Sequence, residues 1–237
     1  ILRKVFQRET AASPYISSQS LPVRPPILCP GCSHRGIFYT LKKLGLHVAG
    51  DIGCYALGSA PPFGCLDTTI CMGASVTAAF GMELARGQEF AQGTVAVIGD
   101  STFFHSGITG LVDLVYNKGQ STILILDNSI TAMTGHQDNP GTGKDIHGLP
   151  APQISIEKLV ESIGIQRIRI IDPFDLKHSE QVIKEELAAG EPSVIIVRRP
   201  CALYVRLKNP PFRVKQQDCI GCKTCLKLGC PAIYMEG

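Results

Sequence analysis

Short runs of hydrophobic residues recur along the chain and are separated by longer amphipathic stretches. The short runs are rich in Val and Ile and nearly continuous, as in strands that are buried on both faces of a sheet. They are HVAGDIG (47–53), TVAVIG (94–99), STILILD (121–127), IQRIRII (165–171) and SVIIVR (193–198). The pattern predicts five buried β-strands.

Stretches with helical character lie between these runs. They are ASVTAAFGMELARG, SGITGLVDLVYNKG, ISIEKLVESIG and PFDLKHSEQVIKEELAAG. The first and the last end in Gly, a common residue at helix C-termini. Because strands and helices alternate, we expect an α/β fold with a doubly wound, mostly parallel sheet and helices on both faces. Such sheets bind ligands at the carboxyl ends of their strands.

Composition divides the chain into three parts. Residues 1–26 are rich in Ser and Pro and are expected to form a linker or arm. Residues 27–208 contain the strands and helices, and residues 209–237 form a terminal module rich in cysteine. Within the main domain, the loop 128–152 is long, rich in Gly, Pro, Asn and Thr, and begins at the end of a strand. We expect this loop to be functional, because loops of that length in compact domains usually are functional or disordered.

The overall composition excludes several classes of function. The 237 residues carry 23 basic and 20 acidic side chains, and a net charge of +3 is too small to indicate nucleic acid or an anionic membrane. Trp is absent and aromatic residues are few, so no platform for stacking bases is expected. No apolar run is long enough to span a bilayer, and the first residues do not resemble a signal peptide.

Cysteine is the residue whose abundance needs an explanation. The chain contains ten cysteines, and six of them lie in Cys-x-x-Cys or similar clusters. A secreted disulfide protein is usually shorter and distributes its cysteines among loops. The clustering therefore favours metal or iron–sulfur ligation in a reducing cytoplasm.

Two polar residues follow two predicted strands. Asp100 comes directly after TVAVIG, and Asn128 follows STILILD, 28 positions later. Adjacent parallel strands would bring a carboxylate, an amide oxygen and a nearby backbone carbonyl to one edge of the sheet, a set that suits Mg²⁺ and phosphate oxygens. A helix expected to start near Ser106 would direct its amide groups to the same place and favour an anion.

A simpler interpretation treats each of these two residues as an ordinary turn former or helix cap. For either residue alone that interpretation is the better one. The two together, each following a buried strand, instead indicate a metal-assisted diphosphate site.

The motifs around these residues resemble one family. GDS followed by a strand and DN resembles the thiamine diphosphate motif, although Ser101 stands where the general motif has Gly. Together the motifs resemble the α subunit of indolepyruvate ferredoxin oxidoreductase over residues 25–237; they are CPGCSHRG, DIGCYALG, DTTICMGAS, GDSTFFHSG and DNSITAMTG. The resemblance implies that residues 27–208 form a thiamine diphosphate-binding domain.

The resemblance also implies a set of cofactor-binding residues. Mg²⁺ would be bound by Asp100, Asn128 and the backbone carbonyl of Ile130. The segments around Ser101, Thr102 and Thr134 would face the diphosphate, and Gly53, Cys54 and Gly99 complete the implied binding set. His105, at the predicted helix start, is the histidine expected to face substrate; most single histidines, including His34 and His136, are scaffold residues.

Four separated cysteines are implied to hold a [4Fe–4S] cluster close to the thiamine, as in related 2-oxoacid ferredoxin oxidoreductases. They are Cys29, Cys32, Cys54 and Cys201, and four thiolates match the needs of such a cluster. A structural zinc site is an alternative, and Cys54 and Cys201 as plain buried cysteines are another. Cys65 and Cys71 are expected to be structural.

The terminal module carries Cys219, Cys222 and Cys225 at ferredoxin spacing, followed by Cys230-Pro. Four residues, LKLG, precede Cys230, where bacterial ferredoxins have three. A zinc knuckle is the competing interpretation, but no histidine follows at a suitable spacing. The chain holds no second such motif to complete a cluster, so we expect a truncated ferredoxin-like module.

The implied reaction is the oxidative decarboxylation of an aryl pyruvate. Electrons would pass through [4Fe–4S] clusters to ferredoxin, coenzyme A would take the acyl group, and a β subunit would be a partner. The chain begins without Met and no second α/β domain is recognisable, so we expect a fragment that is inactive alone. A pyruvate-type enzyme acting on another 2-oxoacid and a non-catalytic electron-transfer module remain alternatives.

Overall fold

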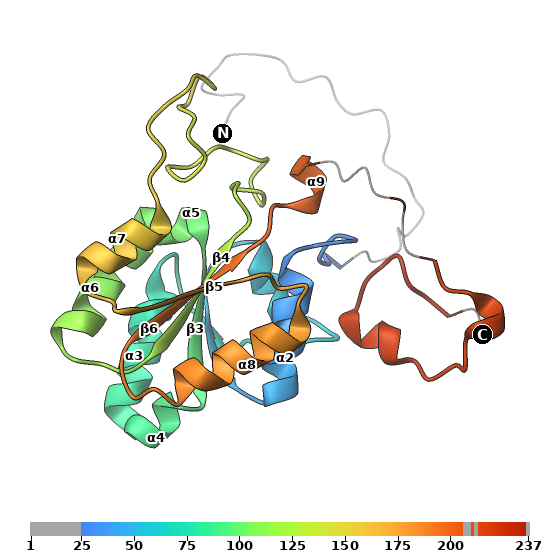
Figure 1. Ribbon diagram of the computed structural model, residues 1–237, viewed down its shortest axis with the longest axis horizontal. Helices are drawn as coiled ribbons and strands as arrows, with labels where there is room; N and C mark the ends of the chain where they lie inside the picture. Colours follow the sequence, from blue (N-terminus) through green and yellow to red (C-terminus); the bar gives the residue numbers. More distant parts are fainter. Residues whose placement is uncertain (1–24, 206–209, 211–212, 236–237) are drawn as a thin grey trace, which may run out of the picture.

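The computed structural model describes residues 25–205, 210 and 213–235 (Figure 1). The predicted arm lies outside the described residues except for residues 25 and 26, as does the predicted boundary at residues 208–209. The described part is a three-layer α/β structure, with one sheet between two layers of helices (Figure 1).

The sheet has six strands in the order β2-β1-β3-β4-β6-β5, and every pair is parallel. Three of the expected strands have nearly the predicted bounds. The strands are β1 (His47–Gly50), β2 (Thr68–Thr69), β3 (Thr94–Gly99), β4 (Thr122–Asp127), β5 (Arg167–Ile171) and β6 (Ser193–Arg198). The predicted doubly wound α/β fold is therefore confirmed, with a two-residue edge strand, β2, that the hydrophobic pattern did not indicate.

Alternation along the central strands divides the core between the two faces of the sheet. On β3, Val95 and Val97 face one cluster, whereas Ala96 and Ile98 face the other. The first cluster lies under α2 (His34–Leu44) and α8 (Leu176–Leu187). The second lies under three further helices, α3 (Ala74–Arg86), α6 (Ile108–Tyr116) and α7 (Ile156–Ile163).

Shorter elements complete the described part. They are η1 (Cys54–Ser59), α4 (Gln88–Ala91), α5 (Asp100–Thr102), η2 (Phe103–Gly107), α9 (Ala202–Val205), η3 (Gln216–Asp218) and η4 (Thr224–Leu228). The terminal cysteine segment contains only η3 and η4 as regular elements among its described residues. It lies beside α2 (Figure 1), and η4 contacts that helix.

Two of the boundaries that differ from the prediction lie at the carboxyl edge of the sheet. Strand β1 ends at Gly50 and not at residue 53, because the buried Asp51 turns its carboxylate to backbone N–H groups. Asp51 Oδ1 accepts from Ile52 and Gly73 at 2.8 Å, and Oδ2 accepts from Ser75 at 2.9 Å. The same carboxylate thus ends the strand and caps α3.

The helix expected near Ser106 begins at Asp100, directly after β3. It runs through α5, a π-helical turn (η2) and α6 without a break in the sequence. Single π turns inside α-helices occur often at functional sites. Helix α2 was not predicted, because its first residues were interpreted as part of a cysteine motif.

Candidate functional site

The two residues of the predicted metal site lie at the same edge of the sheet. Strands β3 and β4 pair in parallel with Gly99 opposite Leu126, so that Asp100 and Asn128 both follow the carboxyl ends of adjacent strands. Both side chains are buried, at 5% and 7% exposure. The neighbouring placement predicted from the sequence is therefore observed.

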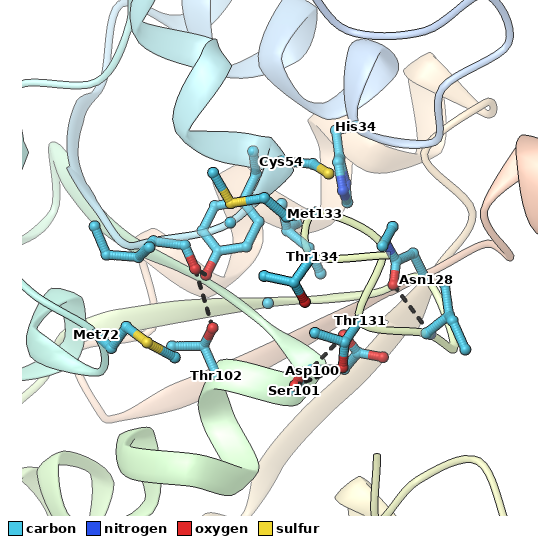
Figure 2. A pocket seen from close by; sticks show the side chains of 17 residues that line it. His34, Cys54, Met72, Asp100, Ser101, Thr102, Asn128, Thr131, Met133 and Thr134 are labelled. Atoms are coloured by element: carbon cyan, nitrogen blue, oxygen red, sulfur yellow. Dashed lines mark hydrogen bonds between the residues drawn. The ribbon is translucent and has the colours of Figure 1, made fainter. Parts of the chain in front are cut away.

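All the residues predicted to bind the cofactor line one cavity at this edge (Figure 2). They come from the loop after β1, from the start of α5 and from the loop after β4. The predicted lining residues are Gly53, Cys54, Gly99, Asp100, Ser101, Thr102, Asn128, Ile130 and Thr134. The structure adds His34, Ile52, Tyr55, Met72, Leu126, Thr131, Ala132 and Met133. The cavity itself measures about 110 Å³.

Hydrogen bonds join the three segments around the cavity. Thr131 Oγ1 donates to Ser101 Oγ at 2.8 Å, which connects the loop after β4 to the helix start. Thr102 Oγ1 and Tyr55 Oη both donate to the carbonyl of Ile52, at 3.0 and 2.8 Å. These bonds fix the walls of the cavity relative to one another.

Asp100 is a buried carboxylate that forms no ion pair with any of the residues that the structure describes. Its Oδ1 accepts from Ser101 N–H at 2.8 Å, and its Oδ2 accepts from the Asn139 amide at 3.3 Å. Burial raises its pKa to about 7, and the neighbouring Asp127 carboxylate acts in the same direction. A divalent cation would offset both effects, and carboxylate, amide and carbonyl oxygens suit Mg²⁺. The donor set of Asp100, Asn128 and Ile130 therefore fits this metal.

Tyr55 explains why two glycines stand at the wall of the cavity. An added Cβ on Gly53 would lie 2.3 Å from the Tyr55 ring, and one on Gly99 would lie 2.5 Å from it. The ring is 4% exposed and fills the space between the two loops. Any larger residue at either position would displace the ring and change the shape of the cavity.

His105, the histidine predicted to face substrate, does not line the cavity. It lies in η2, exposed, with its Nδ1 3.1 Å from Ser106 Oγ. The reason is the early helix start: His105 is in the second turn and not the first, and the turn carries it to the solvent side. The structure therefore does not place His105 at this cavity, and its role in facing substrate stays a prediction.

His34 is the histidine that the structure places at the cavity. It is 4% exposed, and its ring meets that of Tyr55 edge to face at 5.9 Å. Burial lowers its pKa to about 4, so the ring is neutral at pH 7. In Figure 2, His34 and Cys54 lie at one end of the view, and Asp100 and Ser101 lie at the other. The CPGCSHRG motif signalled this residue, but only as a scaffold histidine.

The four separated cysteines line a second cavity of about 340 Å³ next to the first. Cys29, Cys32, Cys54 and Cys201 all contribute to its wall. The two cavities share one set of wall residues, namely His34, Cys54, Asn128, Ala132 and Met133. The structure therefore brings together the four cysteines that the sequence placed far apart, and it puts them beside the cofactor cavity.

The thiols of this cavity are buried and lie near one another. Burial raises the pKa of Cys32 to about 11 and also raises that of Cys54, while nearby cysteines act in the same direction. Among the residues that the structure describes, no three His, Cys, Asp or Glu side chains converge to hold a single metal ion. Four thiols around one cavity match in number the ligands of a [4Fe–4S] cluster and those of a Cys₄ zinc site.

The terminal cysteines are more exposed. Cys219, Cys222 and Cys225 are exposed, and Cys230 is partly buried. All ten cysteines are free thiols in the structure. Of the two expected structural cysteines, Cys65 Sγ lies 3.7 Å from the Gly58 carbonyl, whereas Cys71 is exposed beside the cavity residue Met72.

A cluster of ion pairs that was not predicted from the sequence joins the ends of β4 and β6 near Asp100. Arg198 at the end of β6 contacts Asp127 Oδ2 at 2.6 Å and Glu157 Oε1 at 2.5 Å. The Arg198 hydrogen bond lowers the pKa of Glu157 to about 2. The cluster ties α7 to β4 and β6 directly beside Asn128, so it holds the edge of the sheet where the site is built.

The long loop after β4 forms part of the site, as expected. Thr131 and Gln137 pair through their backbones, at 2.9 and 3.2 Å, and Asn139 returns to Asp100. Its residues 130–134 line the first cavity. In the described part of the chain, no helix is long and apolar enough to cross a membrane.

Comparisons with known proteins agree with this geometry. The family description "Thiamine pyrophosphate enzyme, C-terminal TPP binding domain" matches residues 51–197; thiamine pyrophosphate is thiamine diphosphate. The indolepyruvate oxidoreductase subunit IorA of Pyrococcus horikoshii is 40% identical over 239 residues, which cover 92% of this chain and 37% of the relative. The chain thus spans little more than a third of that relative's length. The resemblance seen in the motifs is confirmed.

More distant relatives extend the comparison. A 2-oxoacid:ferredoxin oxidoreductase subunit beta from Saccharolobus solfataricus is 26% identical over 74% of this chain and 62% of its own length. Among solved structures, the 2-oxoglutarate:ferredoxin oxidoreductase from Magnetococcus marinus, with 2-oxoglutarate, coenzyme A and succinyl-CoA bound, has a TM-score of 0.62 at 18% identity. The match covers 86% of this chain and 77% of the other and shows a common fold.

Proposed function

The chain belongs to the thiamine pyrophosphate enzyme family, because it matches that family's C-terminal TPP binding domain. From this premise we propose that the chain is the cofactor-binding part of a 2-oxoacid ferredoxin oxidoreductase. One observation carries the proposal. The cavity lined by the predicted thiamine residues and the cavity lined by four cysteines share a wall that includes Cys54. A cofactor that generates electrons and a group that accepts them would then lie next to each other.

The residues of the first cavity have separate tasks in this proposal. Asp100, Asn128 and the Ile130 carbonyl hold Mg²⁺, and Ser101 and Thr102 at the helix start bind the diphosphate. When bound, thiamine diphosphate supplies the electron sink that removal of carbon dioxide from a 2-oxoacid requires. Tyr55 and its two glycine neighbours keep the cavity shape and exclude water from it.

The second cavity has the electron-transfer task. Cys29, Cys32, Cys54 and Cys201 would hold a [4Fe–4S] cluster, which would supply a one-electron acceptor beside the first cavity. The terminal cysteines Cys219, Cys222, Cys225 and Cys230 hold or share further [4Fe–4S] clusters in a partial ferredoxin-type module over residues 209–237. Ferredoxin is the proposed external acceptor, and coenzyme A takes the acyl group. The clustering of cysteines at ligand-like spacings supports the reducing cytoplasm as the proposed site of action.

Indolepyruvate is the proposed substrate, and a β subunit is the proposed partner. The similarity to indolepyruvate oxidoreductase subunits supports both. Two methionines, Met72 and Met133, lie at the cavity and are 47% and 59% exposed. Flexible thioether side chains adapt to flat aromatic groups. We expect the complete enzyme to have a higher kcat/KM for indolepyruvate than for pyruvate, and the reverse order would favour another 2-oxoacid.

Calorimetric titration with thiamine diphosphate tests the site. Binding to the full-length protein is expected to require Mg²⁺ and to be lost in Asp100→Ala. The affinity should fall by more than the roughly 10–100-fold that is typical when a residue hydrogen-bonded to a metal ligand is removed. Asp113→Ala, an exposed carboxylate on the same helix run, is the matched control and should bind as the unchanged protein does. Equal binding with and without Mg²⁺ would contradict the proposed site.

A further inference from the structure

Arg35 is a buried arginine whose hydrogen bonds join two distant parts of the chain. It lies in the first turn of α2 and is 6% exposed. Its Nε donates to the Cys29 carbonyl at 3.0 Å, and its Nη2 donates to the Leu28 carbonyl. Its Nη1 donates to the carbonyls of Leu228 and Gly229, at 3.0 and 2.5 Å. One guanidinium therefore connects the first cysteine motif to the terminal cysteine segment.

The charge of Arg35 has no acidic partner among the described residues. None of the ion pairs in the described part of the chain includes this residue, and all four acceptors are neutral carbonyls. A buried charge without a partner is costly. Burial lowers the pKa of Arg35, and the thiols of Cys230, Cys32 and Cys29, which lie near it, act in the opposite direction. The guanidinium thus stands between one cysteine of the terminal module and two cysteines of the second cavity.

The shape of the contact is as specific as its charge. Gly229 has a φ of +58°, and an added Cβ would lie 2.4 Å from Pro62 Cδ and 3.3 Å from Arg35 Nη1. The terminal segment therefore packs closely onto the body at this glycine. Gly221, in the same segment, has a φ of +68° but nothing within 4 Å of an added Cβ. Both glycines have a positive φ, and an added Cβ would contact the body only at Gly229.

We propose that Arg35 is a positioning residue that docks the terminal cysteine segment onto the body, so that Cys230 is held beside Cys29 and Cys32. The proposal rests on the proposed function for its purpose, which is the passage of electrons from the cluster of the second cavity to a terminal cluster. In each such step, a cluster bound beside the thiamine cavity would lose one electron and a cluster bound in the terminal segment would gain it. Docking fixes the distance that this electron must cross.

Hydrogen–deuterium exchange on the cluster-free, full-length protein tests the docking without any cofactor. Arg35→Lys keeps the charge but loses the planar fork that reaches several carbonyls. In Arg35→Lys and in Gly229→Ala, amides of residues 224–230 are expected to exchange roughly 10-fold faster or more, the size expected from lost charge-assisted hydrogen bonds. Gly221→Ala adds the same backbone strain without the contact and should leave those rates unchanged. Exchange in β3 and β4 reports whether the body remains folded.

Unchanged exchange in both Arg35→Lys and Gly229→Ala would overturn the docking role. Gly229→Ala alters no residue of the body, so it decides the matter even if Arg35→Lys unfolds α2. Equal acceleration in Gly221→Ala would also overturn the role, because strain alone would then explain the effect.

Paramagnetic resonance on the iron-loaded, fully reduced protein tests the purpose of the docking. Magnetic interaction between two reduced clusters depends on their separation. We expect this interaction in the unchanged protein, its weakening in Arg35→Lys, and its retention in the matched control Arg86→Lys on α3. An interaction of equal strength in Arg35→Lys would overturn the positioning role. The absence of a cluster signal in the unchanged protein would instead overturn the proposed function. The result of the hydrogen–deuterium exchange experiment would still hold, because that experiment uses cluster-free protein.

Discussion

At the scale of single residues, burial distinguishes the two polar side chains of the predicted metal site. Asp100 and Asn128 were predictable because each directly follows a continuous hydrophobic strand. Their burial at a shared edge then follows from the parallel pairing of β3 and β4. His34 could not be assigned to the site in the same way, because its position beside Tyr55 depends on a contact between two rings that are far apart in the sequence. The spacing of residues along the sequence does not indicate such a contact.

The two histidines give a test at this scale. His34→Gln is expected to lower turnover of the complete enzyme by roughly 100-fold or more, the lower end of the range for loss of a general acid or base. His105→Gln, an exposed change on η2, should leave turnover within about 2-fold, since surface changes cost little. Steady-state kinetics with the 2-oxoacid measure both.

Thiamine diphosphate affinity, measured on the same variants, separates binding from chemistry. A lower turnover for His105→Gln than for His34→Gln would return the substrate-facing role to His105. It would also mean that the helix start at Asp100 does not direct that side chain to solvent.

At the scale of elements, the hydrophobic pattern predicted long elements well and short ones poorly. Strands β3, β4 and β6 end where the Val- and Ile-rich runs end, because every position in them is buried or nearly so. Strand β2 has only two residues, Thr68 and Thr69, too few to show a period. Hydrophobic periodicity also does not indicate the π turn over Phe103–Gly107, which contains His105.

Helix α2 shows how a motif can conceal an element. Ile37, Phe38 and Leu41 are fully buried and have helical spacing, so the period was present in the sequence. The residues from CPGC onward were instead interpreted only as a cysteine motif. The helix has a functional consequence, because its first turn carries both His34 and Arg35.

The ion-pair cluster at the end of β6 gives a prediction about pH. The pKa of Glu157 is about 2 when folded, below its ordinary value of 4.5. The ion pair therefore stabilises the fold above pH 4.5, and this stabilisation is lost as the pH falls toward 2. Glu157→Gln should lower the free energy of unfolding by at most about 1 kcal/mol at pH 7, since Glu157 is about one-third exposed, at 31%.

Urea unfolding at a series of pH values measures this effect. The difference between Glu157→Gln and the unchanged protein should shrink as the pH falls from 4.5 to 2. Glu161→Gln, an exposed change on the same helix, should show no such trend. A difference for Glu157→Gln that stays constant over this range would contradict the ion-pair explanation.

At the scale of the whole molecule, the sequence predicted the fold class and the cofactor motif but not the sharing of a wall between two cavities. Cys54 was assigned both to the cofactor and to the cysteine set, and the structure places it in both cavity walls. The wall also contains Ala132 and Met133, from a loop whose path no hydrophobic pattern encodes. Contacts that depend on the path of a loop can be identified only in the folded structure.

The central claim is that the two cavities work as one unit, with electrons passing from a thiamine-bound 2-oxoacid to a cluster held by Cys29, Cys32, Cys54 and Cys201. The most direct test is freeze-quench paramagnetic resonance on the complete, iron-loaded enzyme mixed with indolepyruvate. Cys201→Ser is the informative variant, because Cys201 lines only the second of these two cavities. We predict a reduced-cluster signal that needs substrate, Mg²⁺ and thiamine diphosphate, and that is lost in Cys201→Ser while the cofactor still binds. A substrate-dependent signal of full size in Cys201→Ser, or none in the loaded, unchanged enzyme, would contradict the claim.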